Sequence, residues 1–180
     1  NMFSTLLEKH DTEKLSRYIE QLASCLANSA HAVPLTRATS FPDKPGVYCL
    51  FEHNTLVYVG ETGSLSARMR DIFRTVNHSF RRSLGKRQFA NVAGVQEANA
   101  KTRFPPDVEI RLTEYMEANI RVALTPVAIG RKEIEEKIVE THSPAFNQGG
   151  SVGSNTTVEA RLRRWDAVPA MPARRPSPSR

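Results

Sequence analysis

Three side chains that could transfer a proton or bind an anion lie close together in the first half of the sequence. Tyr48 and Tyr58 each stand near a glycine in a short apolar run, and Arg68 follows ten residues after Tyr58. A phenol hydroxyl can donate or accept a proton, and a guanidinium group matches the shape of a phosphate or a carboxylate. Tyrosine is also common in strands for packing reasons alone. The chemical interpretation therefore requires both tyrosines on one face of a sheet.

The two apolar runs predict an antiparallel hairpin with strands over Val47–Phe51 and Leu56–Val59. Directly opposed residues of such a hairpin have a constant index sum, and both point to the same face. Tyr48 and Tyr58 therefore share a face only if the connecting loop contains an odd number of residues. A two-residue loop would place them on opposite faces.

A three-residue loop over His53–Thr55 is permitted but not required by the sequence, because its central asparagine tolerates the left-handed backbone conformation that such loops need. This register sets Tyr58 opposite Leu50. It also sets Gly60 opposite Tyr48, so that both tyrosine rings project from the same side of the hairpin.

A helix is predicted after the second strand, with Thr62 or Ser64 as its N-cap. Its apolar positions recur at helical spacing and are Leu65, Met69, Ile72, Phe73 and Val76. On a helical wheel, Arg68 lies at the border of this apolar stripe, whereas Arg70 and Arg74 lie on the solvent side. Arg68 can thus reach inward, although a border arginine can also pack its stem and leave its head in water.

A fourth candidate lies on the helix predicted over Arg131–His142. The inward side of this helix is defined by Ile134, Ile138 and Val139. Glu135 falls near the middle of that side, where a carboxylate is costly unless it is paired or bound to a cation. Glu135 is therefore either an ion-pair partner, for instance of Arg68, or a metal ligand. His142 falls on the same side and is expected to be a core histidine rather than a ligand.

The chain that positions these side chains has 180 residues, enough for one domain with a hydrophobic core. We expect an N-terminal helical extension over residues 1–44, a central domain over residues 45–150 and a basic, disordered tail over residues 151–180. A helix over Val108–Ala118 and a strand over Ile120–Val127 are predicted inside the central domain.

Positive charge is concentrated in the middle of the chain. The net charge is +6, and residues 68–104 alone hold nine basic and two acidic side chains. Such a stripe attracts polyanions, nucleic acid first, although a solvated helix face can carry the same charges. The segment at about residues 73–107 reads as a basic insert in which Phe80 and Phe89 alternate with cations. The side chains expected to contact nucleic acid are Arg70, Arg74, His78, Arg81, Arg82, Lys86 and Arg87.

These features together resemble the GIY-YIG nuclease family. Gly46–Tyr48 reads GVY and Tyr58–Gly60 reads YVG, which are similar to the two signatures of the family. Arg68 falls in the frame YVGETGSLSAR, where the family has its arginine. The segment EEKIVETHSPAFN supplies Glu135, and Asn147 follows it by twelve residues, as in the family's ending.

The resemblance implies a fold of the α/β class, α+β type, with a small antiparallel three-stranded sheet flanked by helices. It implies metal-dependent hydrolysis of double-stranded DNA, with Glu135 holding Mg²⁺ or Mn²⁺. Arg68 would stabilise the negative charge of the transition state, and Tyr48 would orient or deprotonate the attacking water. Tyr58 would position the scissile phosphate. Supporting roles would fall to Gly46, Gly60, His142 and Asn147.

One departure from the family concerns the general base. Some members carry a histidine or tyrosine four residues after the arginine, and here that position is Ile72. His78 is ten residues from Arg68, about 15 Å along a continuous helix, so it can replace the missing group only if the helix breaks first. Tyr48, His78 and metal-bound hydroxide all remain candidates for the base.

Three functions fit these observations. The first is a site-specific type II restriction endonuclease, which would act as a homodimer on a palindromic site. The second is a structure-specific repair or recombination nuclease, or a mobile-element nuclease, of the same family. The third is a DNA-binding protein without catalysis. No apolar run is long enough to span a membrane, and the two cysteines form neither a disulfide framework nor a metal motif, so we expect a cytoplasmic protein.

Overall fold

A four-stranded antiparallel sheet lies at the centre of the part of the chain that the computed structural model describes, residues 2–147. The strands are β1 (Val33–Pro34), β2 (Gly46–Glu52), β3 (Thr55–Thr62) and β4 (Ile120–Pro126), in the order β1-β4-β2-β3. The predicted antiparallel sheet flanked by helices is confirmed, but it has four strands rather than three. The additional strand, β1, pairs with β4 through only two residues, too few to leave an alternating pattern in the sequence.

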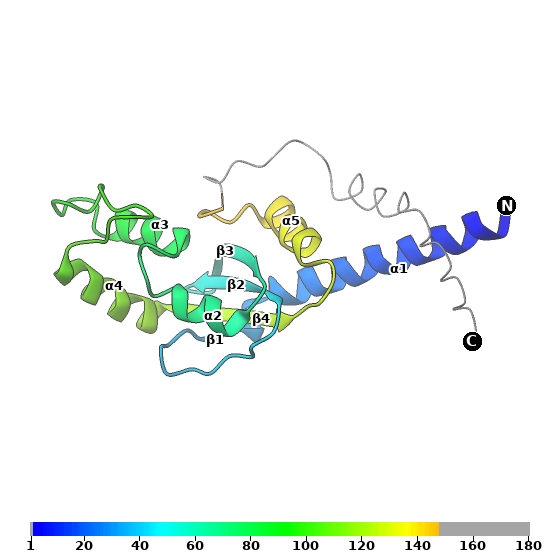
Figure 1. The fold of residues 1–180 in the computed structure, drawn as a ribbon, viewed down its shortest axis with the longest axis horizontal. Helices are drawn as coiled ribbons and strands as arrows, with labels where there is room; N and C mark the ends of the chain where they lie inside the picture. The colour runs from blue at the N-terminus through cyan, green and yellow to red at the C-terminus, as the bar shows by residue number, and fades with distance from the viewer. Residues whose placement is uncertain (1, 148–180) are drawn as a thin grey trace, which may run out of the picture.

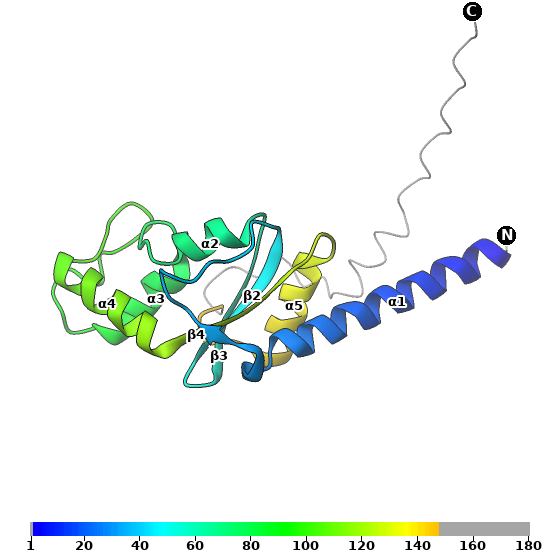
Figure 2. The same ribbon diagram turned by 90° about the horizontal axis from the view of Figure 1, so that it is seen from below.

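Helices cover both faces of the sheet. They are α1 (Met2–Leu26), α2 (Leu65–Asp71), α3 (Ser79–Gln88), α4 (Pro106–Asn119) and α5 (Arg131–His142), with a short 3₁₀ helix, η1, over Ser29–His31. Figure 2 shows α1 and α5 on one side of the sheet and α2, α3 and α4 on the other. The beginning of α1 extends away from the rest of the molecule in both views (Figure 1, Figure 2).

Each face of the sheet has its own hydrophobic core, and β2 is buried along its whole length between them. Val47 and Val59 face the first layer, where they join Ile19 of α1 and Ile138 of α5. Residues of β2 that point the other way join a larger core formed with α2, α3 and α4; its members include Tyr48, Leu50, Leu65, Phe80 and Leu112. The predicted N-terminal extension therefore shares a core with the central part of the chain.

The β2–β3 hairpin pairs Leu50 with Tyr58 through a shorter loop and a β-bulge. Its loop contains two residues, His53 and Asn54, both with positive φ, instead of the three that a shared face was predicted to require. A register shift after Leu50 leaves Val57 as an extra, bulged residue. This bulge restores the pairing of Leu50 with Tyr58, so the tyrosines share a face with a two-residue loop, and the prediction that such a loop would separate them was wrong.

Helix α2 is shorter than the apolar spacing predicts. Ser64 caps its beginning by accepting a hydrogen bond from the Ala67 amide, but the helix ends at Asp71 instead of continuing to Val76. A pair of turns follows, closed in part by the Asn77 side-chain amide, which donates to the Asp71 carboxylate at 2.8 Å. The chain thereby reverses before α3 begins.

Candidate active site

The two signature tyrosines lie side by side on one face of the sheet. Their ring centroids are 6.1 Å apart, and Tyr48 is almost fully buried while Tyr58 is partly exposed. Gly60, opposite Tyr48 on the neighbouring strand, leaves the space that the phenol occupies. A Cβ atom on Gly60 would lie 2.6 Å from the Tyr48 hydroxyl oxygen. The strand pairing and this glycine together fix the position of the hydroxyl.

Gly46 is required for a different close approach. A Cβ atom there would lie 2.6 Å from Cδ1 of Leu65 and would collide with the Thr125 carbonyl oxygen. The absence of a side chain lets the start of α2 pack onto β2, next to β4. The first glycine therefore sets the position of the helix that carries Arg68.

Arg68 projects from α2 toward the tyrosines, as the helical wheel predicts. It lines the same cavity as Tyr48 and Tyr58. Its Nε atom is buried and has no hydrogen-bond partner among the described residues. A buried guanidinium nitrogen without a partner is costly, and an anion in the cavity would supply the missing acceptor.

His78 reaches the site because α2 ends early. It occupies the N-cap position of α3, is 2% exposed, and shares a hydrogen bond of 2.9 Å between its Nε2 atom and the Tyr48 hydroxyl. Burial lowers the pKa of His78 to about 3, with help from the positive charges of Arg68 and Arg82. The imidazole is therefore neutral at neutral pH, and it can accept a hydrogen bond from the phenol.

The pKa of Tyr48 is raised well above its usual value, mainly by burial and also by the neighbouring Tyr58; the charge of Arg68 acts in the opposite direction. The phenol is therefore protonated in the free protein. A protonated phenol bonded to a neutral imidazole forms a pair that can pass on a proton.

Glu135 extends from α5 into the same cavity. Its side chain is 21% exposed, and burial raises the pKa of its carboxyl group. Nζ of Lys132 lies 4.0 Å from the carboxylate, and no ion pair with Arg68 is present among the described residues. Of the two roles expected for Glu135, pairing with Arg68 is therefore not observed.

These side chains line one cavity of about 390 Å³ at the open edge of β3, where residues from both layers meet. Its wall contains the predicted Tyr48, Tyr58, Gly60, Arg68, His78, Arg82 and Glu135. It also contains Glu61, Asn77, Ser79 and Lys132, which sequence reasoning missed. Glu61 directly follows the second signature, and Lys132 lies one helical turn before Glu135. The side-chain periods of the strand and of the helix could therefore have indicated both residues.

Asn147 supports the site from outside the cavity. Its side-chain amide accepts a hydrogen bond from the Val59 N–H and donates one to the Val59 carbonyl, both at 2.9 Å. It thus pairs with the edge strand, between Tyr58 and Gly60, as a neighbouring strand would. His142, predicted on the inward side of α5, is instead exposed. The helix ends there, and Ser143 follows in a left-handed conformation, so the inward stripe does not extend to His142.

Comparison with known proteins identifies the family. Residues 43–165 match the GIY-YIG catalytic domain family. The chain belongs to this family. Among curated proteins, no significantly similar sequence was found.

Solved structures similar to this GIY-YIG chain include point mutants of the GIY-YIG N-terminal endonuclease domain of UvrC from Thermotoga maritima, bound to the catalytic divalent cation. One is 16% identical and another 15%; each has a TM-score of 0.33 and covers 59% of this chain and 84% of that domain.

The residues of the GIY-YIG chain fit a divalent cation of the hard, oxygen-seeking kind. The Glu135 carboxylate is half-buried, with its pKa raised by burial, and a second carboxylate, Glu61, lines the same cavity. Within residues 2–147 no group of three or more potential protein ligands is present. Mg²⁺ is commonly held by one or two carboxylates, with water and phosphate oxygens completing its coordination.

The basic candidates separate into two groups. Arg81 is not available to DNA: it is 1% exposed, and its guanidinium donates to the Glu109 carboxylate at 2.7 Å and to the hydroxyl groups of Thr75 and Thr113. Its prediction as a DNA contact was therefore wrong. Arg87 is bound to Glu52 and lies over the Phe146 ring, 4.9 Å from its centroid.

The other basic candidates remain accessible to a ligand. Arg82 lines the cavity while donating to the carbonyls of Thr75 and Val76. Arg70 and Arg74 are exposed on α2 and the turn after it, and Lys86 is partly exposed on α3. None of the helices within residues 2–147 is long and apolar enough to cross a membrane.

Proposed function

We propose that this GIY-YIG domain is a magnesium-dependent endonuclease that hydrolyses phosphodiester bonds of double-stranded DNA. The observation that carries the proposal is the single cavity in which Tyr48, Tyr58, Arg68 and Glu135 meet. Its polar lining, with an unpartnered guanidinium nitrogen on one side and a carboxylate on the other, suits a phosphate diester bound together with a divalent cation.

Arg68 binds the scissile phosphate in this proposal. Its buried Nε would gain an acceptor, and its fixed charge would stabilise the additional negative charge of the pentavalent transition state. Tyr58, partly exposed beside it, would hold a phosphate oxygen through its hydroxyl. Removal of one such preorganised donor typically lowers turnover by about 100-fold or more.

Tyr48 and His78 act together on the attacking water. As the water oxygen bonds to phosphorus, one water proton moves to the Tyr48 oxygen while the phenol proton moves to Nε2 of His78, which becomes an imidazolium. The bond from phosphorus to the 3′ oxygen breaks, and the released 3′ oxygen takes a proton from solvent. The relay avoids a free phenolate, which the raised pKa of Tyr48 disfavours. The negative phosphate would offset Arg68 and Arg82, the cations that help to keep the pKa of His78 low in the free site.

Glu135 would hold the cation, with Glu61 as the second carboxylate of the cavity. When bound, Mg²⁺ would supply Lewis-acid stabilisation of the negative charge that develops on the phosphate and the leaving group. The carboxyl group of Glu135 has a raised pKa, so a cation would also favour its ionised form.

A site-specific restriction role is the form of this activity that we favour. The basic insert begins at the cavity itself: His78, Ser79 and Arg82 line it, and α3 then carries Lys86 away from the site. Side chains of the insert would thus meet the bases or phosphates beside the scissile bond. Cleavage of both strands at a palindrome requires two copies of the site, and so a homodimer.

The test is cleavage of a long duplex of mixed sequence with Mg²⁺, followed by sequencing of the ends. Wild type is compared with Glu135→Gln and with Glu140→Gln, an exposed glutamate on the same helix. We expect discrete fragments with a common end sequence. Cleavage should fall about 100-fold or more in Glu135→Gln, since several kcal/mol of charge stabilisation are lost, and should be unchanged in Glu140→Gln.

Other outcomes would change the assignment. Cutting without a common end sequence, or only at branched or damaged DNA, would overturn the restriction role in favour of a structure-specific nuclease. Tight, salt-sensitive binding without cleavage in Mg²⁺ or Mn²⁺ would overturn the enzymatic proposal and leave a DNA-binding protein.

A further inference from the structure

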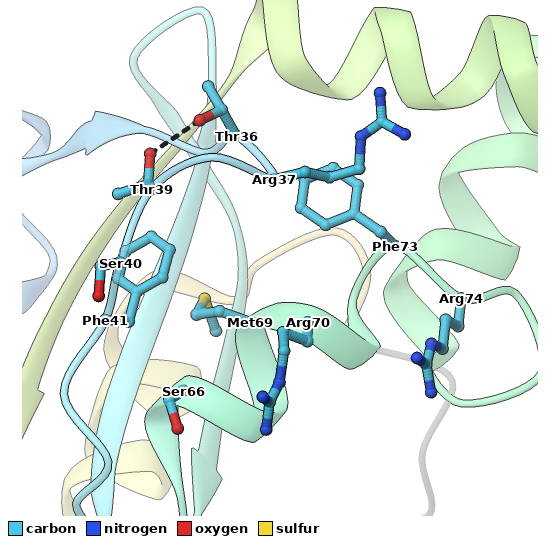
Figure 3. Close-up of a pocket in the computed structure, with 10 residues that line it drawn as sticks. All are labelled: Thr36, Arg37, Thr39, Ser40, Phe41, Ser66, Met69, Arg70, Phe73 and Arg74. Atoms are coloured by element: carbon cyan, nitrogen blue, oxygen red, sulfur yellow. Dashed lines mark hydrogen bonds between the residues drawn. The ribbon is translucent and has the colours of Figure 1, made fainter.

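A second cavity, of about 510 Å³, lies outside the proposed catalytic site (Figure 3). It is lined by ten residues, from the segment between β1 and β2 and from α2 with the turn after it. Three of the ten are arginines, Arg37, Arg70 and Arg74, and none of these ten described residues is acidic. The proposed chemistry of the Tyr48–Glu135 cavity uses none of them.

The arginines differ in how far they are already neutralised. Arg37 is held by Glu117, with Nε 3.2 Å from the carboxylate. Arg74 lies 3.8 Å from the Asp71 carboxylate, and both side chains are exposed, so this pair is weak. Arg70 is exposed and forms no ion pair within the described part of the chain. The pKa of the nearby Asp43 carboxyl is lowered by hydrogen bonds from Ser64 and Ser66 and also by the charge of Arg70, so Arg70 is partly neutralised at longer range. In Figure 3, Arg70 and Arg74 extend in the same direction from α2 and the following turn, while Arg37 turns the other way.

The polar groups that could recognise a base are largely occupied. The hydroxyls of Thr36 and Thr39 are bonded to each other at 2.8 Å, the pair drawn in Figure 3, and Ser66 donates to the Asp43 carboxylate. Three apolar side chains, Phe41, Met69 and Phe73, also line the cavity (Figure 3). Exposed guanidinium groups beside apolar side chains suit the sugar–phosphate backbone, which receives about half or more of the hydrogen bonds that proteins make to DNA.

The second cavity lies about one helix width from the catalytic site. Both cavities border α2: Arg68 faces the catalytic one, whereas Ser66, Met69 and Arg70 face the second. A helix with its side chains is about 10 Å wide, so the two sites are separated by about that distance. One strand of a duplex advances about 3.4 Å per nucleotide, so about three nucleotides would span the helix.

We infer that this second cavity binds the sugar–phosphate backbone of the DNA strand, about three nucleotides from the scissile phosphate. Arg70 and Arg74 take the phosphates, and the deoxyribose packs on Phe41 and Phe73. The inference rests on the proposed function, because it takes DNA as the substrate. The cavity positions the duplex without reading its sequence.

The experiment measures binding of the full chain in a Glu135→Gln background, in which cleavage should be slower by about 100-fold or more. Fluorescence anisotropy with labelled duplexes of about 30 base pairs gives the affinity at several NaCl concentrations. The test variant is Arg70→Gln/Arg74→Gln. The control, Lys14→Gln/Arg17→Gln, removes the same charge from exposed positions on α1. Circular dichroism verifies that each variant is folded.

Loss of two phosphate contacts should make the slope of log K against log [NaCl] shallower by about 1.8, whereas the control should keep the parent slope. The loss of affinity should be equal for three duplexes of unrelated sequence. An unchanged slope in the test variant, or a loss confined to one sequence, would overturn the inference.

The two proposals fail in distinguishable ways. Cleavage by the wild-type chain, together with an unchanged slope in the test variant, would contradict only the proposed role of the second cavity. A shallower slope without any cleavage by the wild type would support DNA binding at the second cavity and contradict the nuclease assignment. Failure of the background protein to bind duplex at low salt would remove both.

Discussion

At the scale of single residues, the pair formed by Tyr48 and His78 would determine, in the proposed mechanism, how a proton leaves the attacking water. Each group alone is poorly suited to act as a base: burial raises the pKa of the phenol and lowers that of the imidazole. Together they share a hydrogen bond of 2.9 Å, so a proton can be taken up without forming a free phenolate.

Tyr48→Phe tests this pair because it keeps the ring that packs over Gly60 and removes only the hydroxyl. Cleavage should fall about 100-fold or more, while duplex binding should stay the same. The unpaired Nε2 of His78 should also cost about 1–3 kcal/mol of unfolding free energy. Tyr115→Phe is the matched control, since it removes a hydroxyl bonded to Glu52 outside the cavity and should leave cleavage intact. Wild-type cleavage by Tyr48→Phe would contradict the relay.

His78 should also make the protein sensitive to mild acid. Its pKa falls from 6.5 to about 3 on folding, so between pH 6.5 and pH 3 this imidazole binds a proton in the unfolded chain but not in the folded chain. Its contribution to stability is therefore present above pH 6.5 and is lost as the pH falls toward 3. Between pH 7 and pH 5 the loss should be about 2 kcal/mol.

Urea unfolding at pH 7 and pH 5 measures this loss. The decrease in unfolding free energy between the two pH values should be smaller by about 2 kcal/mol in His78→Gln than in the wild type. The unfolding free energy of His142→Gln, a substitution at an exposed histidine, should decrease by the same amount as that of the wild type. An equal decrease in all three proteins would show that His78 titrates normally in the folded state.

At the scale of elements, the sequence limited the arrangement at the site to a few alternatives, because side chains alternate along strands and repeat along helices. The register of Tyr58 against Leu50, the inward direction of Arg68 and the helix that carries Glu135 all follow from these periods. The turn has one residue fewer than a three-residue loop, and the bulge at Val57 adds one residue to β3. The residue numbers of opposed residues at the tyrosines therefore have the same sum in both cases. Neither leaves a separate signal, so the loop could not be predicted correctly.

The arrival of His78 and the burial of Arg81 depend on tertiary structure. His78 reaches Tyr48 because α2 ends at Asp71, although the apolar spacing would continue to Val76. Arg81 stands in a run of cations, which is typical of an exposed, DNA-binding helix. Its burial is possible because α4, distant in the sequence, supplies the Glu109 carboxylate and the Thr113 hydroxyl.

Gly60→Ala tests the fit between β3 and the side chain of β2. The added methyl would lie 2.6 Å from the Tyr48 hydroxyl oxygen and 2.7 Å from Cζ, so the ring must move. Cleavage should fall at least about tenfold, and overpacking should cost about 1–3 kcal/mol of unfolding free energy. Gly63→Ala, just after β3, would meet nothing within 4 Å and should match the wild type in both assays. Equal effects of the two substitutions would argue against the fit.

At the scale of the whole molecule, the candidate site depends on both layers of the fold. The α2 and α3 layer provides Arg68 and His78, and the α5 layer provides Glu135; they meet at the exposed edge of β3. Asn147 pairs with that edge through Val59 and so protects it from a further strand. Destabilisation of the α1–α5 core should therefore reduce activity through Glu135, even though α1 does not line the cavity.

One such cavity per chain would cut one phosphodiester bond, and this gives the proposed homodimer a direct consequence. In an equal mixture of wild type and Glu135→Gln, about half of freely exchanging dimers contain one active site. On a supercoiled plasmid with one target site, the mixture should accumulate nicked circles early, whereas wild type alone should proceed to linear DNA. Agarose electrophoresis over time separates the two products. Linear DNA at half the wild-type rate, with no excess of nicked circles, would mean that each active chain cuts both strands without its partner.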